Sequence, residues 1–269
     1  MSQPDRRTTP ATDRVALERL RGILDRPAYT AGEAARVIVP LTDICTAPAG
    51  ARDRQMLLGR AVTVVDRVDG WAFIEDENGF CGWVDAAHIG TAPDPTHRVA
   101  VPATHVYATA SFKQRPQMRL SLGARVAVAG IEGDWAQLDT GDHVPAAHLD
   151  ANPARNPAEV ARLLIGTPYV WGGNSRDGID CSGLAQLSLN ACGIACPGDS
   201  DLQRVVGQEA SGPTQPGDLF FWPGHVAMAL DAVTMIHATA YSMAVITEPI
   251  ATCRARIEAT LPLLTIRRP

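Results

Sequence analysis

Cys181 is the residue of this sequence with the clearest capacity for chemistry. It lies in the run Asp-Cys-Ser-Gly at residues 180–183, directly after a glycine-rich aromatic loop at residues 166–173. The residues that follow, 182–191, predict a helix. At a helix N-terminus, unpaired backbone N–H groups and the helix dipole favour a thiolate. Because the thiolate is the nucleophilic form of cysteine, this position predicts covalent catalysis.

A cysteine nucleophile needs a base, and two downstream histidines are placed to supply one. His225 and His237 each lie in a short apolar run that predicts a β-strand. A polar ring in such a run needs a specific reason to be there, since burying it without a partner is unfavourable. Both histidines are therefore candidates for the acid–base chemistry.

The other five cysteines lie among apolar residues, where a cysteine is more often a buried hydrophobic side chain than a nucleophile. A zinc site at residues 192–196 is the competing interpretation, but the spacing is loose and no second Cys/His pair stands at zinc-like spacing. We therefore predict neither a metal nor a cofactor. The five cysteines expected to be buried are Cys45, Cys81, Cys192, Cys196 and Cys253.

Residues 166–184, taken with His225 and His237, resemble the NlpC family of papain-like cell-wall peptidases. Members carry an Asp-Cys-Ser-Gly nucleophile motif, a catalytic histidine on a strand and a third polar residue on the next strand. The resemblance covers about the last 115 residues, within the usual size of a domain. It implies hydrolysis of the γ-D-glutamyl–diamino acid bond in peptidoglycan stem peptides.

The resemblance also implies a role for each reacting residue. Cys181 attacks the amide carbonyl, and His225 takes the thiol proton and returns one to the leaving amine. His237 accepts a hydrogen bond from the other nitrogen of His225 and orients it. The backbone N–H of Cys181 and the hydroxyl of Tyr169 are the predicted donors to the oxyanion.

Substrate-binding residues follow from relatives that combine SH3-like barrels with this peptidase. Such relatives recognise the free ammonium of L-Ala through an aspartate before the nucleophile, a position that Asp180 matches. Ser182 and Ser200 match positions that contact the substrate, although serine at a helix start also serves as a cap. In the first barrel, Trp83 stands where relatives have a tyrosine that closes the ammonium pocket.

The amino-acid composition argues against a nucleic-acid or membrane partner. The chain has 269 residues, 46% of them hydrophobic and 20% charged, with a net charge of −5. This balance is that of an ordinary globular protein, and the negative charge argues against a nucleic-acid partner. Residues 1–27 are polar and no apolar run reaches the length of a membrane span, so we expect a cytoplasmic protein without a membrane partner.

Around these residues, the pattern predicts an α+β chain of several parts. Apolar residues recur at near-helical period in residues 12–24. Short strands are expected at residues 37–40, 61–65, 71–75 and 80–84, separated by turn signals such as the dipeptides at 69–70 and 78–79. The predicted parts are an N-terminal helical segment (1–35), a first SH3-like barrel (36–95), a second SH3-like barrel (96–150) and a papain-like peptidase domain (151–269).

An internal repeat supports the two barrels. Residues 57–64 parallel residues 120–128, and Trp71 and Trp135 follow at corresponding places, where we expect them in the barrel cores. After the second copy, Asn156 is placed as the N-cap of a helix that runs from Pro157 to about residue 164.

The predicted function is that of a cysteine endopeptidase that cuts free L-Ala-γ-D-Glu-diaminopimelate peptides during recycling of the wall. One alternative is a thiol acyltransferase or amidase on the same fold. The other is a wall-binding protein without activity, against which the presence of Cys181, His225 and His237 together argues, since a decayed site should have lost at least one of them.

Overall fold

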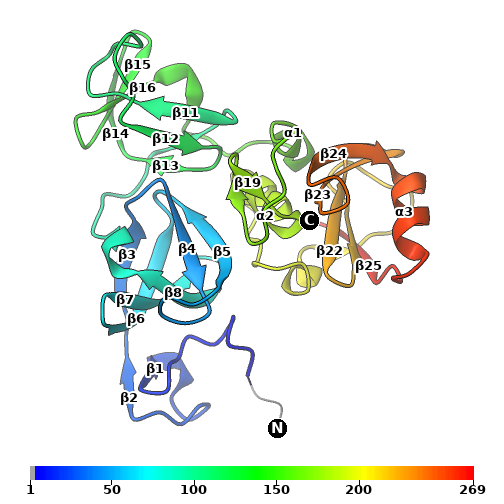
Figure 1. Ribbon diagram of the computed structural model, residues 1–269, viewed down its shortest axis with the longest axis horizontal. Helices are drawn as coiled ribbons and strands as arrows, with labels where there is room; N and C mark the ends of the chain where they lie inside the picture. Colours follow the sequence, from blue (N-terminus) through cyan, green and yellow to red (C-terminus); the bar gives the residue numbers. More distant parts are fainter. Residues whose placement is uncertain (1–3) are drawn as a thin grey trace. The chain divides into compact units, whose positions relative to one another are not determined.

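The computed structural model describes residues 4–269 (Figure 1). The chain divides into two compact units, of which the first ends at Ala151 and the second spans Asn152–Pro269. The first unit is built from β-strands and short 3-10 turns, and the second from three α-helices and a six-stranded sheet. Within residues 4–269, none of the helices has the length and apolar character needed to cross a membrane.

The N-terminal segment contains no α-helix between residues 4 and 32, so the predicted helix is wrong. Two short strands pair in parallel there instead. Leu17 packs with Phe73 and Cys81 of the first barrel, and this burial outweighs the weak helical preference of the segment. The elements are β1 (Val15–Leu17), the 3-10 turn η1 (Glu18–Leu20) and β2 (Ala28–Thr30).

The first barrel is a seven-stranded antiparallel sheet in the order β5-β4-β8-β7-β6-β3-β9. The strands expected near residues 61–65, 71–75 and 80–84 are present, but the strand expected at 37–40 lies earlier and ends at Val37, and β4 and β5 were not predicted. The elements are β3 (Glu33–Val37), β4 (Leu41–Cys45), β5 (Arg52–Leu57), β6 (Ala61–Val68), β7 (Trp71–Asp76), β8 (Cys81–Asp85), the 3-10 turn η2 (Ala86–His88) and β9 (Ile89–Gly90).

The second barrel is a looser set of three small antiparallel sheets, in the orders β13-β10-β17, β11-β12 and β14-β15-β16. Its strands are shorter than those of the first barrel. The elements are β10 (His97–Val99), β11 (Ala103–Val106), β12 (Met118–Ser121), β13 (Arg125–Val126), β14 (Val128–Glu132), β15 (Trp135–Leu138), β16 (His143–Pro145), the 3-10 turn η3 (Ala146–His148) and β17 (Leu149–Asp150).

A hydrogen bond between a threonine and a histidine recurs in both barrels. The Oγ1 atom of Thr42 lies 2.9 Å from Nδ1 of His88, and Oγ1 of Thr104 lies 2.7 Å from Nδ1 of His148. Each histidine ends a 3-10 turn and ties it to an early strand of its own barrel. The sequence repeat therefore corresponds to a repeated structural contact.

The two repeated tryptophans are half-buried, so the expectation that they fill the barrel cores is wrong. Trp71 lines a surface groove of the first barrel together with Asp43 and Asp85. Trp135 packs edge-on against Tyr107, with ring centroids 5.5 Å apart. Each indole begins its strand next to a turn, where one side of the ring stays open to solvent.

The second unit places its sheet between two helices. In Figure 1, strands β22 and β23 lie between α2 and α3. The helix α2 contacts β22 and β23, while α3 buries Ile250 and Cys253 against Phe220 and Trp222 of β21. The sheet order is β20-β25-β21-β22-β23-β24, with every pair antiparallel. This is the layered α+β arrangement expected of a papain-like domain.

The start of α1 confirms one detailed prediction. The side chain of Asn156 accepts a hydrogen bond from the N–H of Ala158 at 2.9 Å, and Pro157 is the first helical residue. The helices of this unit are α1 (Pro157–Arg162), α2 (Cys181–Ala191), α3 (Ile250–Glu258) and the 3-10 helix η4 (Leu202–Val205). The strands are β18 (Asn174–Ser175), β19 (Gly178–Ile179), β20 (Gln208–Glu209), β21 (Leu219–Trp222), β22 (His225–Ala229), β23 (Thr234–Thr239), β24 (Ala244–Pro249) and β25 (Thr265–Arg268).

Candidate active site

Cys181 is the first residue of α2, and Asp180 is the residue that caps this helix. The Oδ1 atom of Asp180 accepts hydrogen bonds from the N–H of Gly183 at 2.6 Å and from the hydroxyl of Ser182 at 2.9 Å. Its Oδ2 atom accepts from the N–H of Gly172 at 2.9 Å. Aspartate is among the preferred N-cap residues because it satisfies these otherwise unpaired donors. Asp180 thus fixes the position of Cys181.

The glycine of the Asp-Cys-Ser-Gly run is required by the loop that packs on the helix. A Cβ atom on Gly183 would lie 2.3 Å from the carbonyl oxygen of Gly173. That distance is far below contact, and the obstacle is backbone that cannot move aside. The glycine-rich loop therefore lies directly against the first turn of α2, next to the nucleophile.

The thiol of Cys181 is protonated in the free protein at neutral pH. Only 8% of the residue is exposed, and burial raises the pKa of the thiol to about 12, with a further increase from the charge of Asp180. Backbone N–H groups, including that of Val226, act in the opposite direction but contribute less. The N–H groups at the helix terminus therefore favour the thiolate, as predicted, but in the free protein burial outweighs them.

The two predicted histidines contact each other. His225 begins β22 and His237 lies in the middle of β23, and Nε2 of His225 is 2.8 Å from Nδ1 of His237. Their ring centroids are 5.0 Å apart at an interplanar angle of 65°. The backbone N–H of Val226, the residue after His225, lowers the pKa of the Cys181 thiol by a hydrogen bond. The packing of α2 on β22 thus brings the nucleophile to the end of the strand that carries His225.

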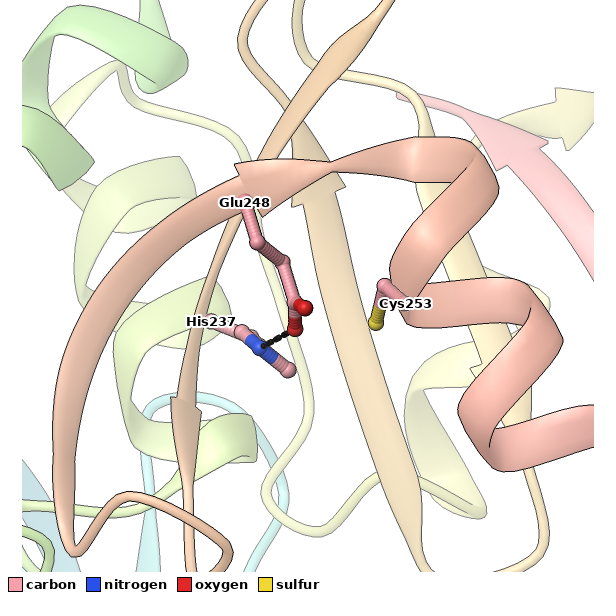
Figure 2. A group of neighbouring side chains, drawn as sticks. All are labelled: His237, Glu248 and Cys253. Atoms are coloured by element: carbon pink, nitrogen blue, oxygen red, sulfur yellow. Dashed lines mark hydrogen bonds and ion pairs between the residues drawn. The ribbon is translucent and has the colours of Figure 1, made fainter.

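Two residues that adjoin the histidine pair were not predicted from the sequence. The Nε2 atom of His237 lies 2.8 Å from Oε1 of Glu248, on the neighbouring strand β24 (Figure 2). Arg256 of α3 donates through both of its terminal nitrogens to the same carboxylate, one at 2.6 Å from Oε2 and the other to Oε1. Strand alternation was the one signal for Glu248. It is two residues after Ile246, the register partner of His237, and residues two apart in a strand point to the same face of the sheet.

The charges along this chain of residues have clear physical causes. Hydrogen bonds from Arg256 lower the pKa of Glu248 to about 2, so it is an anion at neutral pH. Burial, and then the neighbouring His237 and Arg256, lower the pKa of His225 to about 3. Burial also lowers the pKa of His237. Both imidazoles are therefore neutral in the free protein at neutral pH.

A metal ion is a second way to interpret part of this cluster. Ligand atoms of His237, Glu248 and Cys253 lie within 4.8 Å of one another, and Figure 2 shows the three side chains converging from β23, β24 and α3. The guanidinium of Arg256 already binds both carboxylate oxygens, and its charge opposes a cation there. Burial raises the pKa of Cys253 to about 12, which keeps it a thiol. The donor set therefore fits a hydrogen-bonded chain better than a metal centre.

Tyr169 lies near the nucleophile. Burial, followed by the nearby Cys181 and Asp180, raises the pKa of its phenol to about 12. The hydroxyl therefore remains a donor at neutral pH, the form that the predicted oxyanion role requires. Its backbone N–H donates to the carbonyl of Met243 at 2.9 Å, which ties the loop to the turn before β24.

The remaining predicted residues have different surroundings. Ser182 is buried in the first turn of α2, where its hydroxyl donates to Asp180. Ser200 is half-buried in the loop between α2 and η4. Trp83 belongs to the first unit, where it packs edge-on against Phe73 with ring centroids 5.3 Å apart. A role for any of the three in contacting substrate stays a prediction.

Two protein families match separate parts of the chain. Residues 166–255 match the NlpC/P60 family, and residues 44–89 match the bacterial dipeptidyl-peptidase Sh3 domain. The γ-D-glutamyl-L-lysine dipeptidyl-peptidase of Bacillus cereus is 26% identical over 226 residues, which cover 71% of this chain and 68% of that protein. Dipeptidyl-peptidase 6 of Lysinibacillus sphaericus is 37% identical over 111 residues, or 40% of each chain.

The fold is shared with a solved structure. The crystal structure of an NlpC/P60 family protein from Bacillus cereus superposes with a TM-score of 0.76 at 22% identity, covering 88% of this chain and 99% of that one. This likeness confirms the predicted α+β class, with a β-rich SH3-like region before the peptidase domain. The two family matches identify residues 44–89 as a bacterial SH3 domain and residues 166–255, which contain Cys181, His225 and His237, as an NlpC/P60 cysteine peptidase domain.

Proposed function

We propose that this peptidase hydrolyses the γ-D-glutamyl–diamino acid bond of peptidoglycan stem peptides, with free L-Ala-γ-D-Glu-diaminopimelate peptides as its substrates in wall recycling. The observation that carries the proposal is the match, along 71% of the chain, to a protein named γ-D-glutamyl-L-lysine dipeptidyl-peptidase. A dipeptidyl-peptidase releases two residues from a free N-terminus. In a stem peptide those two residues are L-Ala and γ-D-Glu.

The surroundings of Asp180 support recognition of a free ammonium group. Its carboxylate is buried beside the nucleophile, with 7% of the residue exposed. A carboxylate can accept about four hydrogen bonds. Among the described residues, Oδ1 of Asp180 accepts two and Oδ2 accepts one. One position at Oδ2 therefore remains for a substrate donor, and a charge pair is strengthened where water is excluded.

In the proposed reaction, the sulfur of Cys181 attacks the carbonyl carbon of the γ-D-glutamyl bond while its proton passes to His225. Because thiol and imidazole are both neutral in the free protein, this transfer accompanies substrate binding and attack. The C–N bond then breaks, and the amine leaves with the proton from His225. Water, deprotonated by His225, hydrolyses the thioester and restores the thiol. The Tyr169 hydroxyl and the Cys181 N–H are the proposed oxyanion donors.

The proposal places the protein in the cytoplasm. All six cysteines are free thiols, and free thiols persist in reducing compartments, whereas exported proteins tend to form disulfides. Cell fractionation with an antibody against the chain tests this placement. Recovery of the protein in the wall or culture fraction would contradict it.

N-acetylation of the substrate tests the proposed function directly. The free tripeptides L-Ala-γ-D-Glu-diaminopimelate and L-Ala-γ-D-Glu-L-Lys, their N-acetylated forms and intact sacculi are incubated with the protein, and products are identified by mass spectrometry. Losing a buried ammonium–carboxylate contact costs about 2–5 kcal/mol, which corresponds to a fall in kcat/KM of roughly thirtyfold to several thousandfold.

The Cys181→Ala variant is the control for cleavage by a contaminating enzyme. Equal cleavage of free and acetylated peptides would contradict the recycling role and favour a general wall hydrolase. Comparing the lysine and diaminopimelate peptides defines the diamino acid.

A further inference from the structure

We propose that Glu248 is a positioning residue of this peptidase, which fixes the tautomers of His237 and His225 so that Nδ1 of His225 takes the proton of Cys181. Arg256 has a supporting part, because it holds the Glu248 carboxylate in place. The inference rests on the peptidase activity of the family and is independent of which peptide is cut.

The first step concerns the proton between His237 and Glu248. An ionised carboxylate only accepts hydrogen bonds, and Glu248 is ionised because Arg256 donates to both of its oxygens. The 2.8 Å contact between Nε2 of His237 and Oε1 of Glu248 therefore requires the hydrogen to be on Nε2. The tautomer of His237 follows from its partner.

The second step concerns the proton between the two histidines. A neutral His237 with its hydrogen on Nε2 has a lone pair on Nδ1. The 2.8 Å contact from this atom to Nε2 of His225 then requires the hydrogen of His225 to be on Nε2. The lone pair of His225 is consequently on Nδ1, which becomes its basic atom. If Glu248 did not set this order, each histidine could exchange tautomers and Nδ1 would be basic only part of the time.

The geometry around Glu248 is rigid enough for this role. Its side chain is 11% exposed, and that of His237 is fully buried. The guanidinium of Arg256 stacks on the ring of Tyr241, 4.5 Å from the ring centroid, so it is held from both sides. The titratable and charged groups that face this chain of residues are Cys181 on α2, His225 on β22, His237 on β23, Glu248 on β24, Cys253 and Arg256 on α3, and Tyr241 in the turn between β23 and β24.

A purely structural ion pair between α3 and β24 is the competing explanation. The same helix offers a matched control, because Arg254 and Glu258 form a second pair at 2.7 Å. That pair lies within α3, with side chains 40% and 29% exposed, and neither member contacts a histidine in the hydrogen bonds of the described residues. Removing its carboxylate perturbs the helix without touching the catalytic chain.

Four measurements on Glu248→Gln, Glu248→Ala and the control Glu258→Gln test the proposal: kcat and KM on a cleaved peptide, the rate of Cys181 alkylation against pH, histidine tautomers by nitrogen-15 NMR, and the unfolding midpoint. The glutamine retains an acceptor but lacks the charge. We expect kcat to fall about tenfold in Glu248→Gln and about 100-fold in Glu248→Ala, the scale of partners behind metal-binding histidines. KM should stay the same, and Glu258→Gln should match the wild type.

The NMR spectrum of the wild-type protein is decisive by itself, even if a variant fails to fold. We expect His225 and His237 both to carry hydrogen on Nε2 and an unprotonated Nδ1. The opposite tautomer at either residue would overturn the proposal. So would a folded Glu248→Ala variant with wild-type kcat and alkylation rate. Alkylation and NMR need no peptide, so they remain informative if the proposed substrate is not cleaved.

Discussion

Asp180 and Glu248 are both carboxylates that act on the reacting pair, but their surroundings differ. Asp180 adjoins the nucleophile and is held by two backbone N–H groups and a serine hydroxyl. Glu248 lies behind the base and is held by the full charge of Arg256. One carboxylate caps α2, and the other joins β24 to α3.

A negative charge therefore has opposite effects on the formation of the thiolate–imidazolium pair at the two places. The negative charge of Asp180 raises the pKa of Cys181 and so opposes the thiolate. The negative charge of Glu248 raises the pKa values of His225 and His237 and so favours the imidazolium. A substrate ammonium bound at Asp180 would offset the first effect and leave the second in place.

The largest expected effect comes from removing either member of the reacting pair. Cys181→Ala and His225→Ala should each lower kcat/KM on the order of 10⁴- to 10⁶-fold, because residues that act as a unit fail together. The double variant should be no worse than either single one. Steady-state kinetics on one cleaved peptide measures this. Additive losses would mean that the two residues do not form one unit.

The next effect tests the link between Glu248 and the base. His237→Ala should lower kcat/KM on the order of 10²- to 10⁴-fold, since it leaves His225 without its orienting partner. His237→Gln should recover part of the loss, because its amide can donate to Glu248 and accept from His225. His237→Asn should recover less, as it is shorter. Activity of His237→Ala equal to the wild type would require another orienting residue.

A smaller effect is expected in the pH dependence of unfolding. The pKa values of His225 and His237 are lowered in the folded state, so the unfolded chain binds protons first as pH falls below about 6.5. Stability should therefore fall between about pH 6.5 and 3, by on the order of 1–2 kcal/mol at pH 5. Glu248, with a pKa of about 2 when folded, adds a further loss below about pH 4.5.

Urea unfolding at pH 7.5 and pH 5 measures this pH dependence. A double variant with glutamine at positions 225 and 237 should lose less stability over the same range. An identical pH dependence in the wild type and in this variant would show that the histidines are not the source.

The smallest expected effect tests most directly whether the charges of Asp180 and Glu248 act in opposite directions on the reactivity of Cys181. Asp180→Asn should raise the rate of Cys181 alkylation by iodoacetamide about three- to tenfold near neutral pH, because the opposing charge is gone while asparagine still caps the helix. Glu248→Gln should lower that rate by a similar factor. Mass spectrometry of the Cys181 peptide across a pH series measures both. Changes of the alkylation rate in the same direction would show that the two carboxylates do not have opposite effects on Cys181.

The nucleophile and both histidines were accessible from the sequence because each has a local signal. Cys181 lies in a short motif, and His225 and His237 interrupt apolar strands. Glu248 and Arg256 have no such signal. Their partnership depends on the register of β23 against β24 and on where α3 packs, and neither follows from the residues of one segment.

The secondary structure could be predicted where the local sequence pattern was strong. The prediction was wrong where tertiary packing decided which element forms. Asn156 and Pro157 mark the start of α1 by local chemistry alone. In residues 12–24 the spacing of apolar residues suggested a helix, but contact of Leu17 with the first barrel selected a strand. The strand β5 was missed because Arg52, Asp53 and Arg54 make its start look like a loop.

The repeated threonine–histidine bond gives the two barrels one structural contact in common, at corresponding positions of the sequence repeat. The two copies differ at the positions beside that bond. Asp43 and Asp85, which line the groove of the first barrel, correspond to His105 and Pro145 in the second. The contact that holds the turn is thus common to both copies, whereas the surface around it carries two carboxylates in the first barrel and neither of them in the second.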